Sequence, residues 1–269
     1  MTEGITFADI DDIAVHYRVD GPEHAPKLVF SNSLGTDFRT WDGVVGRLAD
    51  RYRMLRYDTR GHGLSGCPDG AYSIERLGED LAGLMDAVGF DRAVICGLSV
   101  GGVTAQQLHK AHPDKVAALI LCDTNAKIGD AAMWQERIDG ALGDGGIEAL
   151  APAILERWFS AGYQAKYPTD LDGWRNMLVR TPGIGYAGVC HALKEGDLRD
   201  HCINIMLPTL VVCGAEDGAT TPEAVQALAN AIPAARYLEI PDAGHLPCIE
   251  QPGVLADAID AFMKENSSE

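Results

Sequence analysis

Apolar and polar positions alternate between two patterns along the first half of the chain. Short apolar or alternating segments, typical of β-strands, occur at residues 12–19, 27–31 and 52–57. Segments with apolar residues three and four positions apart, the spacing of one helix face, occur at residues 41–49 and 74–88. Ser73 and Gly89 are predicted to begin and end the second of these helices.

The same alternation continues through a strand at 93–96, a helix at 100–112 and a strand at 116–122. Parallel strands need crossover connections, so regular alternation of strand and helix predicts a mostly parallel sheet with helices on both faces. The predicted fold class is therefore α/β. Ligands of such sheets bind at the carboxyl ends of the strands.

Residues 124–207 interrupt the alternation with helical segments that contain Trp134, Trp158, Phe159 and Trp174. An unstructured loop of that length is uncommon in a compact domain, so we expect a helical cap inserted above the sheet. Alternatively, these aromatic side chains form only the core of the cap itself. Strand and helix patterns then resume. The sequence therefore predicts an α/β core domain of residues 1–123 and 208–269, with the cap inserted between them.

One serine lies at a strand-to-helix junction between two glycines, in Gly97-Leu98-Ser99-Val100-Gly101. A chain that turns this sharply holds the serine in a strained backbone conformation and exposes its hydroxyl. The Val100 N–H, in the first helical turn, points to where an oxyanion would form. The pattern predicts a nucleophile elbow, and the alternative is a glycine-rich turn with a capping serine.

A serine nucleophile needs a general base and a carboxylate that orients the base. Asp217 and His245 follow the last two predicted strands, at the edge where the elbow lies. We therefore expect Ser99, Asp217 and His245 to form a catalytic triad. Asp123 and Glu216 are alternative acids, and His62 is expected to tie together the turn after residues 52–57.

The loop after the strand at 27–31 is expected to supply a second oxyanion donor. It reads Ser31-Asn32-Ser33-Leu34-Gly35-Thr36, and the Leu34 N–H is the candidate partner of the Val100 N–H. Gly35 would let this loop bend toward the substrate. The side chain of Asn32 or Ser33 could contact the substrate, or serve only the turn.

The net charge of −17 and the lack of Lys and Arg clusters argue against nucleic acid and anionic membranes as partners. The sequence contains no stretch of 18 apolar residues, the length that a bilayer-spanning helix needs. The amino terminus lacks the basic start and apolar run of a signal peptide, so nothing predicts export. A homo-oligomer is compatible with the sequence.

Seven cysteines form an odd set without CxxC spacing, so neither a disulfide framework nor a zinc site is predicted. Reduced thiols fit a cytoplasmic protein. None of the cysteines has the surroundings that lower a thiol pKa, and we expect no metal site.

Four stretches of the chain are informative together: VFSNSLGT at 29–36, LRYDTRGHG at 55–63, CGLS at 96–99 and LERWF at 155–159. They resemble the 3-oxoadipate enol-lactonases of the α/β-hydrolase superfamily. The DxRGHG and GxSxGG motifs are common to the superfamily, whereas the SNSLGT loop and the RWF of the cap are more specific. Val100 stands where methionine is usual, and only its backbone N–H is needed.

The resemblance implies an α/β-hydrolase fold with the triad in the order Ser, Asp, His. It also implies hydrolysis of 3-oxoadipate enol-lactone to 3-oxoadipate in the β-ketoadipate pathway, without metal or organic cofactor. Related activities that keep the triad are those of a carboxylesterase, a carbon–carbon bond hydrolase and a cofactor-free perhydrolase. A ligand receptor without turnover is a further alternative.

The lactone implied by the resemblance carries a free carboxylate, which a protein of charge −17 repels. A local cation must offset this repulsion. Arg137 and Arg157 of the cap are the candidates. We expect Trp134 and Trp158, which are close to them in sequence, and Ser33 to contact the substrate as well. The alternative is that each arginine only forms a surface ion pair.

Overall fold

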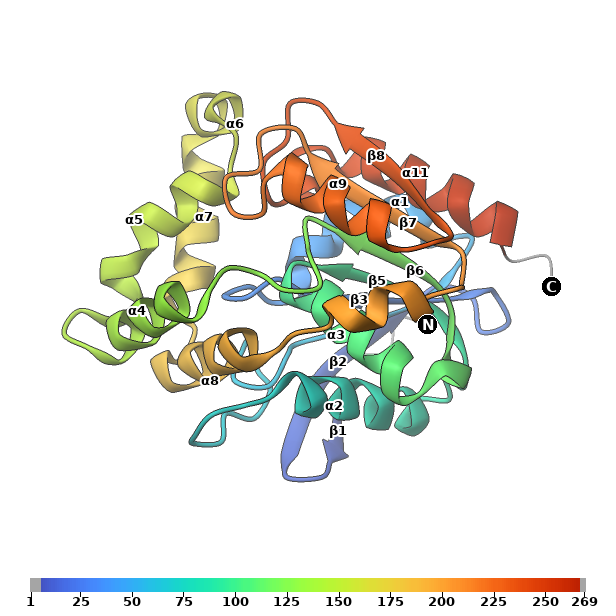
Figure 1. Cartoon of the computed structure of the whole chain (residues 1–269), viewed down its shortest axis with the longest axis horizontal. Coiled ribbons are helices and arrows are strands. Elements are labelled where there is room, and N and C mark those ends of the chain that lie inside the picture. Colours follow the sequence, from blue (N-terminus) through green and yellow to red (C-terminus); the bar gives the residue numbers. More distant parts are fainter. Residues whose placement is uncertain (1–5, 267–269) are drawn as a thin grey trace.

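The protein is built around one twisted eight-stranded sheet (Figure 1). The computed structural model describes residues 6–266. The strands run in the order β1-β2-β4-β3-β5-β6-β7-β8 across the sheet. Their bounds are β1 Thr6–Ile10, β2 Ile13–Asp20, β3 Lys27–Ser31, β4 Arg53–Tyr57, β5 Ala93–Leu98, β6 Val116–Cys122, β7 Thr209–Gly214 and β8 Ala235–Ile240.

Strands β3 to β8 pair in parallel, while β1 and β2 form an antiparallel edge. All six residues of β5 and all six of β7 are buried, as expected for strands covered by helices on both faces. Strand β1 alternates between partly exposed and exposed side chains until Ile10. The parallel α/β sheet predicted from the sequence is confirmed.

The core helices lie in pairs on the sheet. Helix α2 packs on α3, α1 packs on α11, and α9 covers β7 and β8; Figure 1 shows α2 and α3 near β1 and β2 in the lower part of the molecule, and α9 and α11 near β7 and β8 in the upper part. Their bounds are α1 Asp42–Leu48, α2 Ile74–Ala87, α3 Val100–Ala111, α9 Pro222–Ala231, α10 Pro247–Glu250 and α11 Pro252–Asn266. The side chain of Ser73 caps α2 by accepting from the Arg76 N–H, as predicted.

Five helices follow β6 before the chain returns to the sheet at β7. They are α4 Ala131–Leu142, α5 Gly146–Trp158, α6 Ala161–Lys166, α7 Pro168–Val179 and α8 Gly183–Glu195. They form the lobe on the left of Figure 1, where α4 packs on α8. The 3₁₀ segment Arg199–Asn204 instead contacts α9 on the core. The Nε2 atom of its His201 lies 3.0 Å from the Nδ1 atom of His109 in α3.

Two glycines let α8 approach the core closely. A Cβ on Gly185 would lie 2.2 Å from the Gly61 carbonyl oxygen, and a Cβ on Gly188 would lie 2.6 Å from the Tyr72 ring. The Tyr72 N–H also donates to the Gly188 carbonyl, at 3.1 Å. The lobe is thus fixed to the core at the turn that follows β4.

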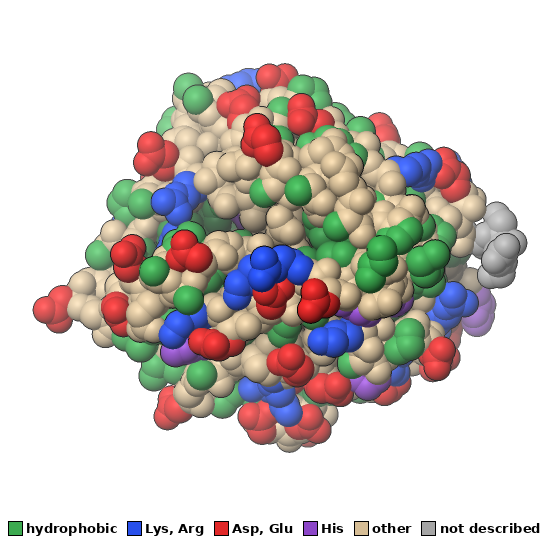
Figure 2. All heavy atoms as spheres, viewed as in Figure 1, with side chains coloured by type: hydrophobic (Ala, Val, Ile, Leu, Met, Phe, Trp, Pro, Cys, Tyr) green, Lys and Arg blue, Asp and Glu red, His purple; other side chains and the backbone are tan. Residues whose placement is uncertain are grey.

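Acidic side chains are scattered over the face shown in Figure 2, with Lys and Arg side chains among them. This distribution agrees with the excess of 39 Asp and Glu over 22 Lys and Arg. In the part of the chain that the structure describes, no helix has the length and apolarity needed to cross a membrane.

Candidate active site

Ser99 occupies the turn between β5 and α3 with φ 57° and ψ −118°, a conformation that L-residues rarely adopt. Neighbouring glycines make the turn possible. A Cβ on Gly97 would lie 2.2 Å from the Gly101 carbonyl oxygen, and a Cβ on Gly101 would lie 2.2 Å from that of Ser31. The Ser99 N–H donates to the Cys122 carbonyl at 2.9 Å, which ties the turn to β6.

Asp217 and His245 form a buried pair at the ends of β7 and β8. The His245 Nδ1 lies 2.9 Å from the Asp217 Oδ2. Burial acts to raise the pKa of Asp217, but the His245 ring, the Thr220 hydroxyl and the Ala219 N–H outweigh it and hold this pKa below its usual value. The ionised carboxylate therefore keeps the Nδ1–H tautomer of His245, which leaves Nε2 free to accept a proton.

The Nε2 atom of His245 faces the cavity that contains Ser99. In the structure described, it contacts the Ser33 hydroxyl at 3.5 Å, and its hydrogen bond to Ser99 is not formed. Catalytic hydrogen bonds are often long before substrate binds. Ser99 and His245 are both at least nine-tenths buried, so a reaction here would be shielded from water.

The loop that carries His245 is bonded to the cap. The His245 N–H donates to the Trp158 carbonyl at 2.9 Å, at the end of α5. The Glu250 carboxylate accepts from the Gly244 N–H at 2.7 Å and from the Ser160 hydroxyl at 2.6 Å. The base is therefore supported from both the core and the cap.

The loop after β3 brings Leu34 to the same cavity. Gly35 has φ 77°, and its N–H donates to His62 Nε2 at 2.9 Å. The His62 Nδ1–H donates to the Arg60 carbonyl, and burial lowers the pKa of His62, so the ring stays neutral. As predicted, His62 stabilises the turn after β4. Its bond to the Gly35 N–H also holds the loop that carries Leu34.

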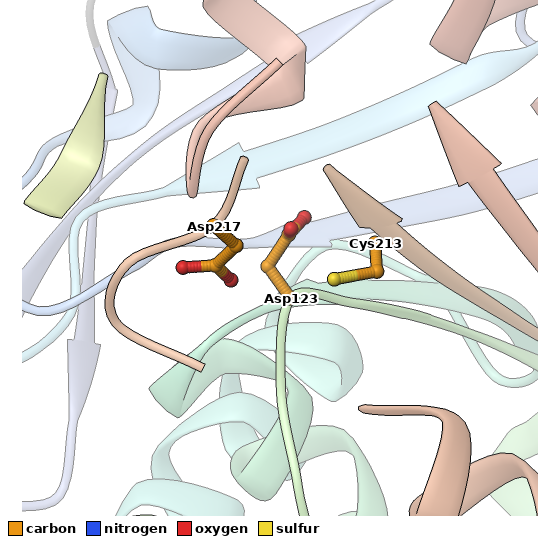
Figure 3. Close-up of side chains that lie close together, drawn as sticks. All are labelled: Asp123, Cys213 and Asp217. Atoms are coloured by element: carbon orange, nitrogen blue, oxygen red, sulfur yellow. The ribbon is translucent and has the colours of Figure 1, made fainter. Parts of the chain in front are cut away.

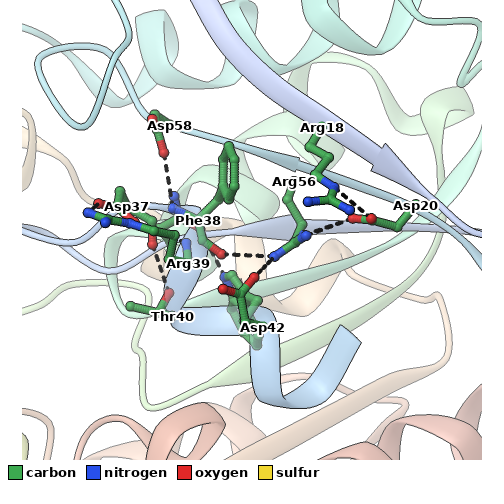
Figure 4. A network of polar contacts seen from close by, with 11 residues as sticks. Arg18, Asp20, Asp37, Phe38, Arg39, Thr40, Asp42, Arg56 and Asp58 are labelled. Atoms are coloured by element: carbon green, nitrogen blue, oxygen red, sulfur yellow. Dashed lines mark hydrogen bonds and ion pairs between the residues drawn. The ribbon is translucent and has the colours of Figure 1, made fainter. Parts of the chain in front are cut away.

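A polar network holds the next part of this loop (Figure 4). The Phe38 N–H donates to Asp58 Oδ1 at 3.0 Å. The buried Arg56 guanidinium binds Asp20 at 2.7 Å and also contacts Asp42. Arg56 and Asp42 thus link β4 to the start of α1. This link restrains the segment that follows Leu34.

The residues predicted to contact the substrate line the Ser99 cavity, whose volume is about 70 Å³. The predicted substrate contacts are Ser33, Trp134, Arg137, Arg157 and Trp158. The cavity is also lined by Leu34, Ser99 and His245. Arg137 is half-buried and donates to the Tyr186 hydroxyl at 3.2 Å, whereas Arg157 is exposed. Among the described residues, neither arginine forms an ion pair, so both guanidinium groups are available to an anion.

Two residues of the site were missed by sequence reasoning. Tyr186 lies fully buried in the cavity wall, and burial raises the pKa of its hydroxyl, which therefore stays protonated. Thr220 donates to Asp217 Oδ2 at 2.7 Å. Neither belongs to a motif, and only the folded chain brings them to Ser99.

The two alternative acids do not contact His245. Glu216 is exposed, whereas Asp123 is fully buried behind Asp217 at the end of β6. Figure 3 shows Asp123 between Asp217 and Cys213, whose polar atoms lie within 4.8 Å of one another. Asp217 already accepts four hydrogen bonds, so this group is poorly suited to hold a metal ion.

A larger cavity lies elsewhere, between α7 and the segment after β3, with a volume of about 930 Å³. It contains a second His–Asp pair, His16 and Asp58, whose Nδ1 and Oδ2 atoms are 2.6 Å apart. Its described lining includes no serine or cysteine. The chemistry of the strand ends therefore points to the smaller Ser99 cavity.

Comparison with known proteins agrees with this geometry. The alpha/beta hydrolase family matches residues 28–258. The chain belongs to this family. It is 37% identical over 253 residues to 3-oxoadipate enol-lactonase 2 of Acinetobacter baylyi, covering 94% of each chain, and 35% identical to 3-oxoadipate enol-lactonase 1 of that organism, covering 92% of each.

The crystal structure of the enol-lactonase from Burkholderia xenovorans LB400 superposes with a TM-score of 0.93 at 42% identity, covering 96% of this chain and all of that one. A thermophilic esterase from Thermogutta terrifontis gives a TM-score of 0.90 at 28% identity, with 98% of both chains covered. The predicted α/β-hydrolase fold and the resemblance to enol-lactonases are confirmed. The chain is a hydrolase of ester or lactone bonds.

Proposed function

We propose that this hydrolase opens the ring of 3-oxoadipate enol-lactone to give 3-oxoadipate, using Ser99 as nucleophile. One observation carries the proposal. One cavity is lined by Ser99, by His245, which pairs with Asp217, and by Arg137, whose guanidinium forms no ion pair with any described residue. These groups match a substrate that has both a lactone carbonyl and a carboxylate.

In the first step, His245 Nε2 takes the Ser99 proton while Oγ attacks the lactone carbonyl. The N–H groups of Leu34 and Val100 stabilise the oxyanion, each by about 3 kcal/mol. Val100 is the first residue of α3, so its N–H has no partner within the helix. As the ring opens, protonated His245 gives this proton to the leaving oxygen. The enol that forms is a better leaving group than an alkoxide and then becomes a ketone.

In the second step, His245 takes a proton from the water that attacks the acyl–Ser99 ester, and returns it to the Ser99 oxygen as the acid is released. Asp217 stays ionised throughout and stabilises the imidazolium that forms in each half-reaction. All proton transfers are accounted for by these side chains. The proposed reaction needs no metal ion and no organic cofactor.

Arg137 is the residue that we assign to the substrate carboxylate. Its guanidinium lies in the cavity and is held by the Tyr186 hydroxyl. This contact uses one of its five N–H donors and leaves the others for a carboxylate. Arg157 lines the same cavity but is exposed, so water weakens its attraction for an anion.

A cytoplasmic role in the β-ketoadipate pathway is part of the same proposal. The names of the two Acinetobacter baylyi relatives support the substrate. All seven cysteines are free thiols, and six of them are buried, which fits a reducing compartment.

The test is to follow the loss of the enol-lactone spectrophotometrically. Ser99→Ala should lower kcat by at least about 10⁴-fold, and Ser73→Ala, a serine far from the cavity, should keep the wild-type rate. Parallel assays with aryl esters and dienones compare the alternative activities. If the wild-type protein hydrolyses an aryl ester but leaves the lactone intact, the proposed substrate is wrong and the serine hydrolase remains.

A further inference from the structure

A second buried carboxyl group lies directly behind the proposed catalytic acid. Asp123 ends β6 in a left-handed conformation, φ 47°, and its side chain is fully buried. Figure 3 shows Asp123 between Asp217 and Cys213, and one carboxylate oxygen of each aspartate and the Cys213 Sγ lie within 4.8 Å of one another.

The two carboxyl groups are bonded very differently. Asp217 accepts from the N–H groups of Ala219 and Thr220, from the Thr220 hydroxyl and from His245 Nδ1, at 2.7–3.0 Å. Asp123 Oδ1 accepts only from the Gly214 N–H at 2.8 Å, and its Oδ2 is buried without a partner. A buried oxygen without a donor is costly for a carboxylate, but suits the O–H of a neutral acid.

The charges around Asp123 favour the same protonation state. Among the described residues, the titratable groups that act on Asp123 include Cys122, Cys213, Asp217, Tyr237 and Cys248, and none of these is a cation. Burial and the neighbouring Asp217 carboxylate raise the pKa of Asp123 well above its usual value. Two adjacent buried carboxyl groups without a cation cannot both ionise.

We infer that Asp123 is a protonated carboxylic acid that positions Asp217, donating from its otherwise unpartnered Oδ2 to the Asp217 carboxylate. It is a positioning residue, because it acts on His245 only through Asp217. The inference rests on the roles proposed above for Asp217 and His245. In this arrangement the acid of the triad is a carboxylate stabilised by a neutral carboxylic acid.

The donor has a defined effect on the base. A hydrogen bond to Asp217 lowers the basicity of that carboxylate, so Asp217 attracts the His245 proton less strongly. Without the donor, Asp217 should hold the His245 proton more strongly. The acidic limb of the kcat/KM profile should then move to higher pH.

Infrared difference spectroscopy tests the protonation state directly and needs no substrate. At neutral pH the wild-type protein should show the carbonyl stretch of a buried carboxylic acid, and Asp123→Asn should lose it. Asp217→Asn is the matched control, and its spectrum should keep a carboxylic acid band. A wild-type spectrum without that band would overturn the inference.

Kinetics on a neutral aryl ester test the positioning role, independently of the lactone. Asparagine is uncharged, tolerates positive φ, and offers an N–H in place of the O–H. Asp123→Asn should therefore keep kcat/KM within about threefold and the same pH profile. Asp123→Gly, which also tolerates this φ, should lower kcat about tenfold and move the acidic limb upward by up to about 1 pH unit.

Two kinetic results would contradict the inference. A loss of more than about 100-fold in Asp123→Asn would mean that the charge of Asp123 is needed, and an unchanged pH profile in Asp123→Gly would mean that it positions nothing. Thermal unfolding checks that both variants fold. Failure of the proposed triad would show differently, as aryl-ester hydrolysis that survives Ser99→Ala.

Discussion

Arg137 is the one half-buried cation in the described lining of the Ser99 cavity, and its role distinguishes a lactonase from a general esterase. Arg137→Met should lower kcat/KM on the enol-lactone about 30-fold, because loss of a partly desolvated charge contact costs about 2 kcal/mol. Hydrolysis of a neutral ester should change little. Steady-state kinetics on both substrates provides the measurement.

Arg157→Met is the matched control, since Arg157 lines the same cavity but is exposed. We expect an effect below about fivefold, as for other solvent-screened contacts. Equal losses on lactone and ester in Arg137→Met would mean that this arginine supports the cavity and does not recognise the carboxylate.

His62 gives a prediction with a pH dependence. His62→Phe keeps the ring but leaves the Gly35 N–H without its acceptor, so the loop that carries Leu34 should shift. We expect the free energy of unfolding to fall by about 1–3 kcal/mol and kcat/KM to fall about tenfold. Denaturant unfolding and ester hydrolysis measure the two effects.

The sign of the pH dependence follows from the lowered pKa of His62. The folded protein binds fewer protons here than the unfolded chain, whose histidine pKa is about 6.5. The stabilisation is therefore complete above that pH and is lost as pH falls through the lower folded pKa. The stability difference between wild type and His62→Phe should shrink in acid. A difference that does not vary with pH would contradict the assigned tautomer.

Among individual residues, the sequence predicted those that belong to motifs. Ser99, Asp217 and His245 each follow a strand, so chain order and strand ends predicted their meeting. Tyr186 and Thr220 carry no such signal, because their contacts depend on helix placement and loop shape. The structure brings all of these residues together, and their catalytic roles stay predictions.

Among the elements of the cap, α8 approaches the core closely. Gly185→Ala would place a methyl group 2.2 Å from the Gly61 carbonyl oxygen, so α8 must move outward. We expect the protein to lose about 1–3 kcal/mol of stability. KM for the lactone should rise, because Tyr186, the next residue, holds Arg137. Calorimetry and steady-state kinetics measure these changes.

Gly173→Ala in α7 is the control, since no atom lies within 4 Å of the added methyl group. Its stability should stay the same or rise slightly, as alanine favours helix. If Gly185→Ala melts with the wild type and keeps its KM, the contact between α8 and the turn after β4 does not hold the cap.

The sequence predicted most strands of the sheet, but not the edge strand β1 or the boundaries of the cap helices. The seven strands from β2 to β8 were found because each is a short apolar or alternating run. Strand β1 was missed, since its five residues include only one fully buried side chain, Ile10. The cap was predicted as helical, but the boundaries of α4 to α8 depend on packing between helices, which periodicity alone does not reveal.

For the whole molecule, the charge of −17 predicts an unusual salt dependence. The repulsion of an anionic lactone acts over long distances and is screened beyond about 10 Å at 0.1 M salt. The attraction by Arg137 acts within the cavity and is screened less. Raising the ionic strength from about 0.02 to 0.3 M should therefore increase kcat/KM on the lactone roughly twofold to threefold.

A neutral ester serves as the control, because its rate should not follow this trend. A decrease of lactone hydrolysis with salt would mean that attraction within the cavity governs the encounter, and that the net charge does not.

The bond between the His245 loop and the end of α5 has a consequence for protein engineering. Cap domains are natural units to exchange between related hydrolases when a new specificity is wanted. Here a transplanted cap would also remove the Trp158 carbonyl and the Ser160 hydroxyl, which hold His245 and Glu250. A chimaera must rebuild both contacts at the graft junction, or it will acquire a new pocket beside a poorly aligned base.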